Sequence, residues 1–224
     1  MTSAFPRRPR VLKGALVAYA SALLGPVPNV IVFQYNPDTV TRTVRHRTRA
    51  PAGSEAGGRA RAGEPIRVTG PPQESLSLTI TLDATDKLEV ADPLAVTVGV
   101  HPALAALELL LYPDSTQVLR NAALTQAGAS AVPAAEVPSV LLVWGLGRVV
   151  PVSIESLAIT ERAYDPLLNP TLADVDVSLQ VLTYLDLALG SVGHGASVAH
   201  HIAKEALARA NVVDTAATAV AQAL

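Results

Sequence analysis

NVIVFQYNPDTVTR, residues 29–42, is the stretch that decides the fold of this chain. An apolar run enters Asn36-Pro37-Asp38, and an alternating segment leaves it with threonines on one face, namely Thr39, Thr41 and Thr43. Alternation is the period of a half-buried strand, and proline after asparagine commonly begins a turn. We therefore predict two strands, Val30–Tyr35 and Val40–Thr48, at a strand–turn–strand corner that carries no catalytic group.

Composition limits the kind of core and the kind of partner. The chain has 224 residues, 50% of them hydrophobic but only 4% aromatic, so Val, Leu, Ile and Ala must build the core. That composition favours thin layers and sheets over an aromatic-lined ligand pocket. A net charge of -2 gives no overall attraction to nucleic acid or to anionic lipid. The absence of cysteine removes disulfides, thiolate nucleophiles and Cys-ligated metal sites.

The N-terminal segment has two interpretations. Arginines precede the short apolar run from Gly14 to Leu24, as in an export signal. A Gly25-Pro26-Val27-Pro28 turn and another strand follow, so we favour a first strand at Lys13–Tyr19 and no signal peptide. No segment reaches the ~20 apolar residues that cross a bilayer, so we expect a soluble, cytoplasmic protein without membrane insertion.

Further strands and a helix follow from hydrophobic periodicity. The clearest alternation is Gln73–Asp83, and His101-Pro102 begins a helix with leucines at helical spacing. Asn121–Pro138 resembles a low-complexity loop or a frayed helix end. The remaining predicted strands are Val140–Trp144, Val149–Glu161 and Asp174–Tyr184. These elements predict an α+β domain: a mainly antiparallel β-barrel or split sandwich with one central helix.

Two compositional changes divide the chain. Residues 50–72 are small, polar and basic, which predicts a long exposed, flexible loop. Residues 193–224 are rich in alanine and only weakly amphipathic, which predicts a C-terminal helix that needs a partner surface. We therefore expect a β domain at 1–190 and a helical arm at 191–224.

The sequence offers no convincing catalytic, cofactor or metal site. His200 and His201 are adjacent, so on a helix they point about 100° apart and cannot easily bind one ion. Gly145-Leu146-Gly147 lacks the third glycine of a phosphate loop and precedes a strand. The acidic residues that follow Leu82, including Asp83 and Asp86, lack calcium-loop spacing and are predicted to face solvent or a partner. The chain is predicted not to be an enzyme.

Basic residues cluster after the corner. The cluster contains Arg42, Arg45, Arg47, Arg49, Arg59 and Arg61. It has no aromatic residue for base stacking, which makes nucleic acid the weakest interpretation. Two interpretations remain open: a solvated strand and loop, or a docking surface for acidic neighbours. The docking interpretation also includes Asp83 and Asp86 as partner-binding residues.

Several ordered pieces of the chain resemble the tube and baseplate proteins of contractile injection systems, the phage-tail-like devices. The corner is similar to a family pattern FQYNP-x-T-L/V-x-R, and Val140–Gly145 followed by Pro151–Glu161 is similar to a second pattern. Other pieces are Lys13–Val17, Pro71–Glu74, Leu82–Asp86 and Val100–Tyr112, and the similarity covers about residues 12–185. Many relatives continue into a LysM module, but residues 193–224 are too short and too alanine-rich for one.

The resemblance implies a tail-tube-type fold and a structural role. Such proteins form six-copy rings that join the inner tube and spike hub to the wedge or sheath components of a baseplate. It implies partners among the tube, spike, sheath and baseplate subunits, no cofactor, and assembly in the cytoplasm into a particle. Two alternatives remain: an inner tube protein, or a cell-wall or carbohydrate-binding β module.

Overall fold

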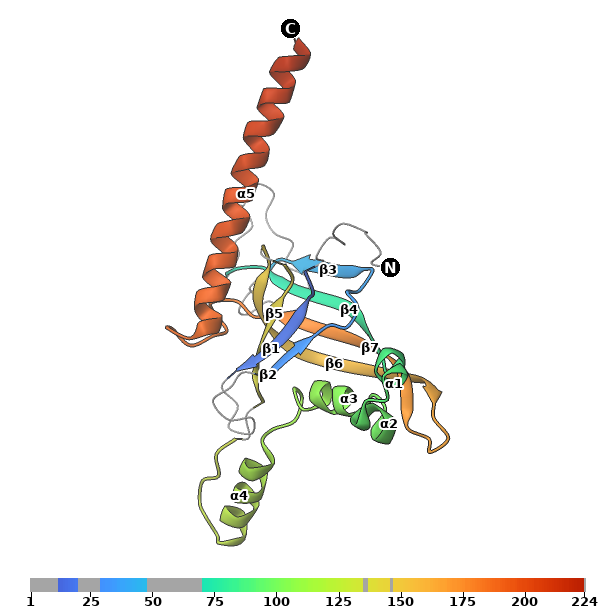
Figure 1. Cartoon of the computed structure of the whole chain (residues 1–224). Helices are drawn as coiled ribbons and strands as arrows, with labels where there is room; N and C mark the ends of the chain where they lie inside the picture. Colours follow the sequence, from blue (N-terminus) through green and yellow to red (C-terminus); the bar gives the residue numbers. More distant parts are fainter. Residues whose placement is uncertain (1–11, 20–28, 48–69, 135–136, 146, 224) are drawn as a thin grey trace, which may run out of the picture.

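The computed structural model describes residues 12–19, 29–47, 70–134, 137–145 and 147–223, with side chains described as far as Val212 (Figure 1). Its strands are β1 (Ala15–Tyr19), β2 (Asn29–Val32), β3 (Val40–Arg45), β4 (Gln73–Asp83), β5 (Ser139–Val143), β6 (Val149–Tyr164) and β7 (Pro170–Val181). Its helices are α1 (Thr85–Glu89), α2 (Pro93–Val98), α3 (His101–Glu108), α4 (Ser115–Gln126) and α5 (Val192–Ala223).

The seven described strands form one antiparallel sheet in the order β2-β1-β5-β6-β7-β4-β3. The prediction of a mainly antiparallel α+β fold with a C-terminal helix is confirmed. The clearest alternation in the sequence, Gln73–Asp83, is strand β4 with the bounds that the periodicity predicts.

The two strands of the corner do not pair with each other. β2 and β3 lie at opposite edges of the sheet, although only residues 33–39 connect them. Seven strands laid flat would separate the edges by ~29 Å, which a bent seven-residue link cannot span. The sheet must therefore curl strongly, and Figure 1 shows β1, β2 and β5 crossing over β4, β6 and β7.

The expectation of a closed barrel or split sandwich needs correction. Among the described residues the sheet stays open, because no ladder joins β2 to β3. Side chains of the corner bridge this seam instead, as described below. A curled open sheet satisfies the same alternating pattern as a barrel, so the pattern alone could not distinguish the two.

The expectation of one central helix is also wrong. Four helices lie between β4 and β5, and α3 is the predicted one. Asp92 caps α2 by accepting bonds from Leu94 N and Ala95 N, and Asp114 caps α4 by accepting one from Thr116 N. These aspartate caps are the local signals for the extra helices, and α4 includes residues 121–126 of the predicted loop or frayed end.

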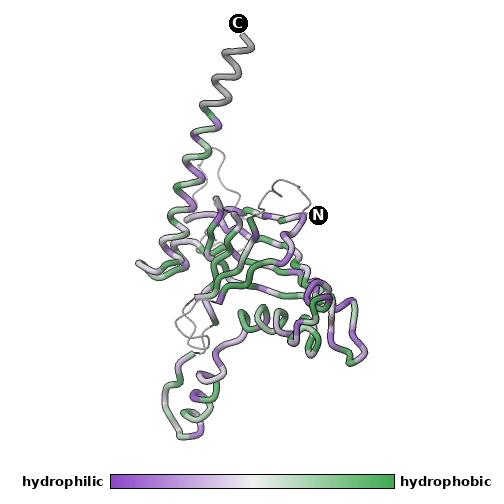
Figure 2. The backbone as a smooth tube through the Cα atoms, viewed as in Figure 1, coloured by the Kyte–Doolittle hydropathy of each residue, from purple (hydrophilic) through white to green (hydrophobic). Residues whose placement is uncertain are grey.

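Helix α3 closes the concave side of the sheet (Figures 1 and 2). Its buried residues Leu104 and Leu107, with Leu110 just beyond its end, join the inward-facing residues of the strands in one core. Leucines three apart on a helix share one face, which explains how a short helix covers the sheet. The outward face of β4 and β7 is polar, with Thr79 donating to Asp176 and Thr81 to Asp174.

Three parts project from this body: α4, the β6–β7 hairpin and the far half of α5 (Figure 1). Helix α4 has no buried residue. Helix α5 packs against β6 in its first half and then extends away from the sheet. Within the described residues, no helix is both long and apolar enough to span a membrane.

Candidate functional site

The corner is a clamp made of two side-chain amides. Gln34 donates from Nε2 to the carbonyl of Asp83 (2.8 Å) and accepts at Oε1 from the amide of the same residue (3.0 Å). Asn36 accepts at Oδ1 from Gly14 N (2.8 Å) and donates from Nδ2 to Leu12 O (2.8 Å). Each amide thus imitates a strand backbone, so the corner bonds to the start of the β1 segment and to the end of β4.

An aromatic contact supports the clamp from inside. Phe33 is 1% exposed and its ring lies 6.2 Å from that of Trp144, centroid to centroid, at 54°. Gly14 lies beneath both rings, and a Cβ there would come within 2.7 Å of Phe33 Cδ2. The glycine is therefore required by packing, and the partly buried Trp144 packs against the core.

The structure places three of the six predicted arginines. Arg42 and Arg45 lie on edge strand β3 with exposed side chains. Arg47 follows the strand and donates to Asp186 from both terminal guanidinium nitrogens, Nη1 and Nη2, at 3.0 to 3.2 Å. The other three, Arg49, Arg59 and Arg61, lie outside the described residues, as does most of the predicted loop at 50–72.

The Arg47–Asp186 pair joins β3 to the segment between β7 and α5. Asp186 also accepts from Thr183 N (3.0 Å) and from Thr183 Oγ1 (2.6 Å). Burial by itself raises the pKa of Asp186, but the hydrogen bonds from Arg47 and Thr183 outweigh this effect and lower the pKa to about 2. The same pair raises the pKa of Arg47. Arg47 therefore has a partner within its own chain, unlike a purely solvated arginine.

The two predicted aspartates lie at the end of β4. Asp83 accepts from Thr85 N (2.7 Å) and Thr85 Oγ1 (2.5 Å), while its backbone is held by Gln34. Asp86 is an exposed residue in the first turn of α1. Asp83 thus shapes the β4–α1 turn, and Asp86 is the one whose side chain faces solvent.

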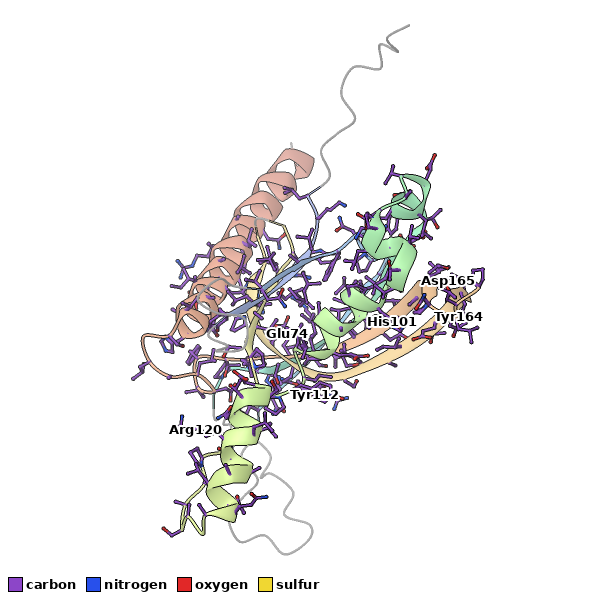
Figure 3. All side chains as sticks on the ribbon, turned by 60° about the horizontal axis from the view of Figure 1, so that its bottom comes forward. Glu74, His101, Tyr112, Arg120, Tyr164 and Asp165 are labelled. Atoms are coloured by element: carbon purple, nitrogen blue, oxygen red, sulfur yellow. The ribbon has the colours of Figure 1, made fainter. Side chains whose placement is uncertain are left out.

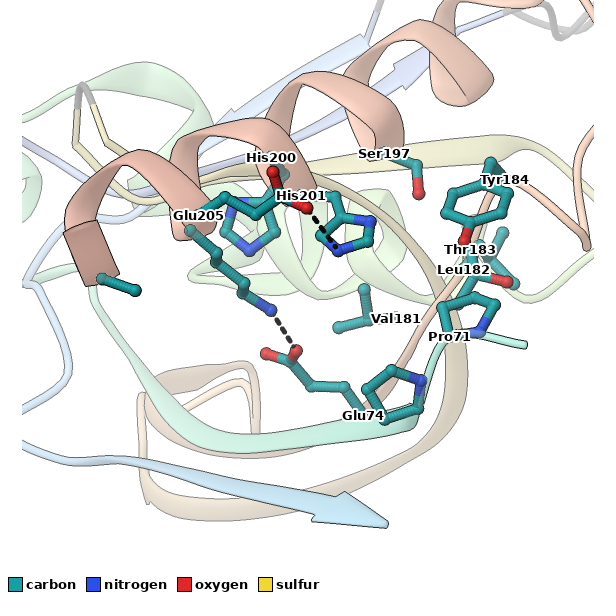
Figure 4. A pocket seen from close by; sticks show the side chains of 13 residues that line it. Pro71, Glu74, Val181, Leu182, Thr183, Tyr184, Ser197, His200, His201 and Glu205 are labelled. Atoms are coloured by element: carbon teal, nitrogen blue, oxygen red, sulfur yellow. Dashed lines mark hydrogen bonds and ion pairs between the residues drawn. The ribbon is translucent and has the colours of Figure 1, made fainter. Parts of the chain in front are cut away.

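A pocket of about 320 Å³ separates the first half of α5 from the end of the sheet (Figure 4). Its walls include Pro71, Pro72, Val181, Leu182 and Tyr184. The carboxylate of Glu74 lies at its base, with 7% of the side chain exposed, and accepts from Lys204 Nζ of α5 at 2.7 Å.

Cationic groups surround this pocket. Arg42 also approaches Glu74 (3.6 Å), so one buried carboxylate faces two cations. The pKa of His200 is lowered first by burial and then by Lys204, while Glu74 opposes the shift and Arg148 and Arg42 add to it. Glu205 also lines the pocket, with Arg209 at 3.7 Å, so the cations in and around the pocket outnumber its two carboxylates.

The adjacent histidines do not form a metal site. His201 stacks on Tyr184, with ring centroids 6.2 Å apart, and its Nε2 lies 3.6 Å from Glu205 Oε1. His200 and His201 both line the pocket (Figure 4). In the described part of the chain, no three His, Cys, Asp or Glu residues are grouped so that they could hold a metal ion.

The β6–β7 hairpin ends in an exposed apolar tip (Figure 3). Leu167 and Leu168 are each 77% exposed. The side chain of Asp165 holds the turn, accepting from Leu167 N and from the backbone and side-chain amides of Asn169, each at 2.8 Å. These bonds, chiefly those from Asn169, lower the pKa of Asp165, so the tip carries a carboxylate beside its leucines.

Sequence reasoning did not find the pocket, the Arg47–Asp186 pair or the apolar tip. The signals were weak: Glu74 occupies an inward position of the β4 alternation, and Leu167-Leu168 interrupts a turn sequence. A scan against protein-family models and a search of curated proteins return no match to this chain. The resemblance to contractile-injection-system proteins therefore depends only on the residues quoted for it.

Proposed function

We propose that this chain is a structural baseplate component of a contractile injection system. As a ring subunit of tail-tube type, it joins the inner tube and spike hub to the surrounding baseplate and sheath. Assembly takes place in the cytoplasm, and the protein has no catalytic role.

The observation that best supports this proposal is the form of the sheet. Among the described residues, the edge strands β2 and β3 each pair with one strand, and their exposed side chains differ in chemistry. β2 exposes Val30 and Val32, whereas β3 exposes Arg42 and Arg45 together with two threonines and Val44. A ring of identical subunits joined head to tail needs two different surfaces on each copy.

The projecting elements support the same function. Large apolar side chains are exposed on all three, including Leu119 on α4, Leu167 on the hairpin and Val212 on the far half of α5. Apolar surface of this kind marks contact sites for other proteins. The exposed tyrosines are scattered: Tyr35 lies in the β2–β3 link, Tyr112 between α3 and α4, and Tyr164 at the end of β6. They therefore offer little support for a carbohydrate-binding platform.

An affinity pull-down of the tagged chain from its native cell lysate tests the proposal. Mass spectrometry should identify tube, sheath, spike and wedge proteins, and negative-stain images should show rods that carry the tag at one end. A tag along the whole rod would indicate an inner tube protein instead. A lone monomer without rods would refute the proposal and favour a binding module.

A further inference from the structure

The hairpin tip and the α5 pocket lie at opposite ends of one strand. The tip directly precedes β7, and pocket residues Val181, Leu182 and Tyr184 end or directly follow it. A strand of 12 residues spans roughly 40 Å, so the two features cannot meet within one molecule. Figure 3 shows Tyr164 and Asp165 at the far end of the hairpin, well away from Glu74.

The two features are complementary in shape and polarity. The tip is convex and presents two leucines, and the pocket is concave with walls of proline, valine, leucine and tyrosine. A cavity of ~150 Å³ holds a benzene ring, so the pocket's 320 Å³ accommodates more than one aliphatic side chain.

Charge complements the apolar fit. The tip carries the Asp165 carboxylate. Lys204 lines the pocket and Arg42, Arg148 and Arg209 lie near it, so these cations outnumber the two carboxylates of the lining, Glu74 and Glu205. An acidic apolar tip entering a basic apolar pocket is thus attracted by the surrounding cations.

Backbone strain at the tip is a further observation. Leu168 has φ of 66°, a left-handed conformation that is unfavourable for a branched side chain and natural for glycine. Strain of about 1–2 kcal/mol is maintained here on an exposed leucine. Such strain clusters where a residue serves a contact rather than the stability of its own fold.

We propose that the hairpin tip of one copy inserts Leu167 and Leu168 into the α5 pocket of a second copy. The contact is head to tail, so each copy uses its tip on one neighbour and its pocket on the other. This inference rests on the proposed function, because it assumes that the copies are neighbours in a ring. A single tip buries less than a standard interface, so the isolated pair is weak and ring closure strengthens it.

The test is sedimentation velocity on the full chain over a wide range of concentrations. Wild type should associate reversibly. Leu168→Asp, at the tip, and Ala208→Glu, at the pocket, should each weaken association about tenfold or more, a loss of ~1.4 kcal/mol for each factor of ten. Leu119→Asp alters an equally exposed leucine on α4 and should leave association unchanged. Leu168→Gly should raise the melting temperature by relieving strain and still weaken association.

Mixing the two deficient variants gives the sharpest result. Leu168→Asp retains an intact pocket and Ala208→Glu an intact tip, so the mixture should form a one-to-one dimer and nothing larger. A wild type that stays monomeric throughout, or a mixture that forms no dimer, overturns the inference.

The outcomes separate this inference from the proposed function. If wild type is monomeric yet Leu168→Asp is lost from particles, the tip binds a different protein, and the ring function stands without this contact. If self-association follows the prediction but no particle proteins co-purify, the contact stands and the proposed function fails.

Discussion

At the residue scale, the corner depends on two amides that each use a donor and an acceptor. Gln34 and Asn36 satisfy backbone groups of Asp83, Gly14 and Leu12. Only an amide offers both functions in the spacing of a peptide group. Residues 33–36, FQYN, therefore stabilise a curled sheet whose edge strands β2 and β3 do not pair with each other.

Replacing one amide with an isosteric carboxylate should weaken the clamp. In Gln34→Glu, the donor to the Asp83 carbonyl is lost and a carboxylate faces that oxygen, so we expect a loss of about 1–3 kcal/mol in unfolding free energy. Urea denaturation at neutral pH measures it, with Gln126→Glu at an exposed position of α4 as the matched control. Equal stability of the two variants would contradict the clamp.

The Arg47–Asp186 pair predicts an acid-dependent contribution to stability. The folded pKa of Asp186, about 2, lies below its ordinary value of 3.8. Its stabilisation is therefore complete above about pH 4 and is lost as the pH falls through about 2. Asp186→Asn should cost at most about 2 kcal/mol at pH 7, because solvent screens a partly exposed pair.

The pH dependence of stability distinguishes loss of the Asp186 titration from a general structural defect of the Asp186→Asn variant. Thermal melts of wild type and Asp186→Asn should differ at pH 7 and converge toward pH 2. Glu155→Gln, an isosteric change at an exposed strand position, should follow wild type throughout. If the two melting temperatures differ as much at pH 2 as at pH 7, the titration of Asp186 does not cause the difference.

At the element scale, the ion pair between Lys204 and Glu74 holds α5 to the sheet, and only the carboxylate of this pair is buried. Glu74 has 7% of its side chain exposed, and Lys204 has 41%. Losing the cation leaves a buried carboxylate with the longer Arg42 contact alone. Removing one partner of such a pair costs more than the pair itself contributes.

Lys204→Ala should therefore loosen α5 selectively. We expect a loss of about 1–3 kcal/mol, less than for a fully buried pair because lysine is half exposed. Hydrogen exchange should show reduced protection in residues 192–208 and little change in β6 and β7. Adding Glu74→Gln should recover part of the loss, since a neutral amide needs no cation. Further loss in the double variant would contradict this account.

At the scale of the whole molecule, Arg45 and Arg47 must be tested separately. If both arginines served docking alone, changing them together to glutamate would block assembly and leave the fold intact. The structure gives Arg47 an internal partner, so Arg47→Glu places a second acid beside Asp186 and should lower the melting temperature.

Arg45→Glu isolates the docking hypothesis. Its side chain is exposed on β3, so the melting temperature should change little while the subunit fails to enter particles. Thermal melts and co-purification with particle proteins measure the two effects. Arg120→Glu, on exposed α4, is the control. Normal incorporation of a stable Arg45→Glu variant would refute docking through β3.

Local patterns determined much of this protein from its sequence. The alternation of β4, the leucine spacing of α3 and the alanine-rich run of α5 each predict an element, because period and composition act within one segment. Short helices such as α1 and α2 were missed. Helix α1 has no side-chain cap, and the aspartate cap of α2 is a weak signal without a long apolar period.

Only the tertiary structure decided how distant segments meet. The open curled sheet, the Gln34–Asp83 and Arg47–Asp186 pairs, and the Glu74 pocket join residues that lie 49 to 139 positions apart. Such contacts depend on the order of the strands and on the curl of the sheet. No local sequence pattern encodes how the two edges of the sheet are placed relative to each other. The sequence therefore determined the elements and their inward faces, and packing determined the surfaces on which function depends.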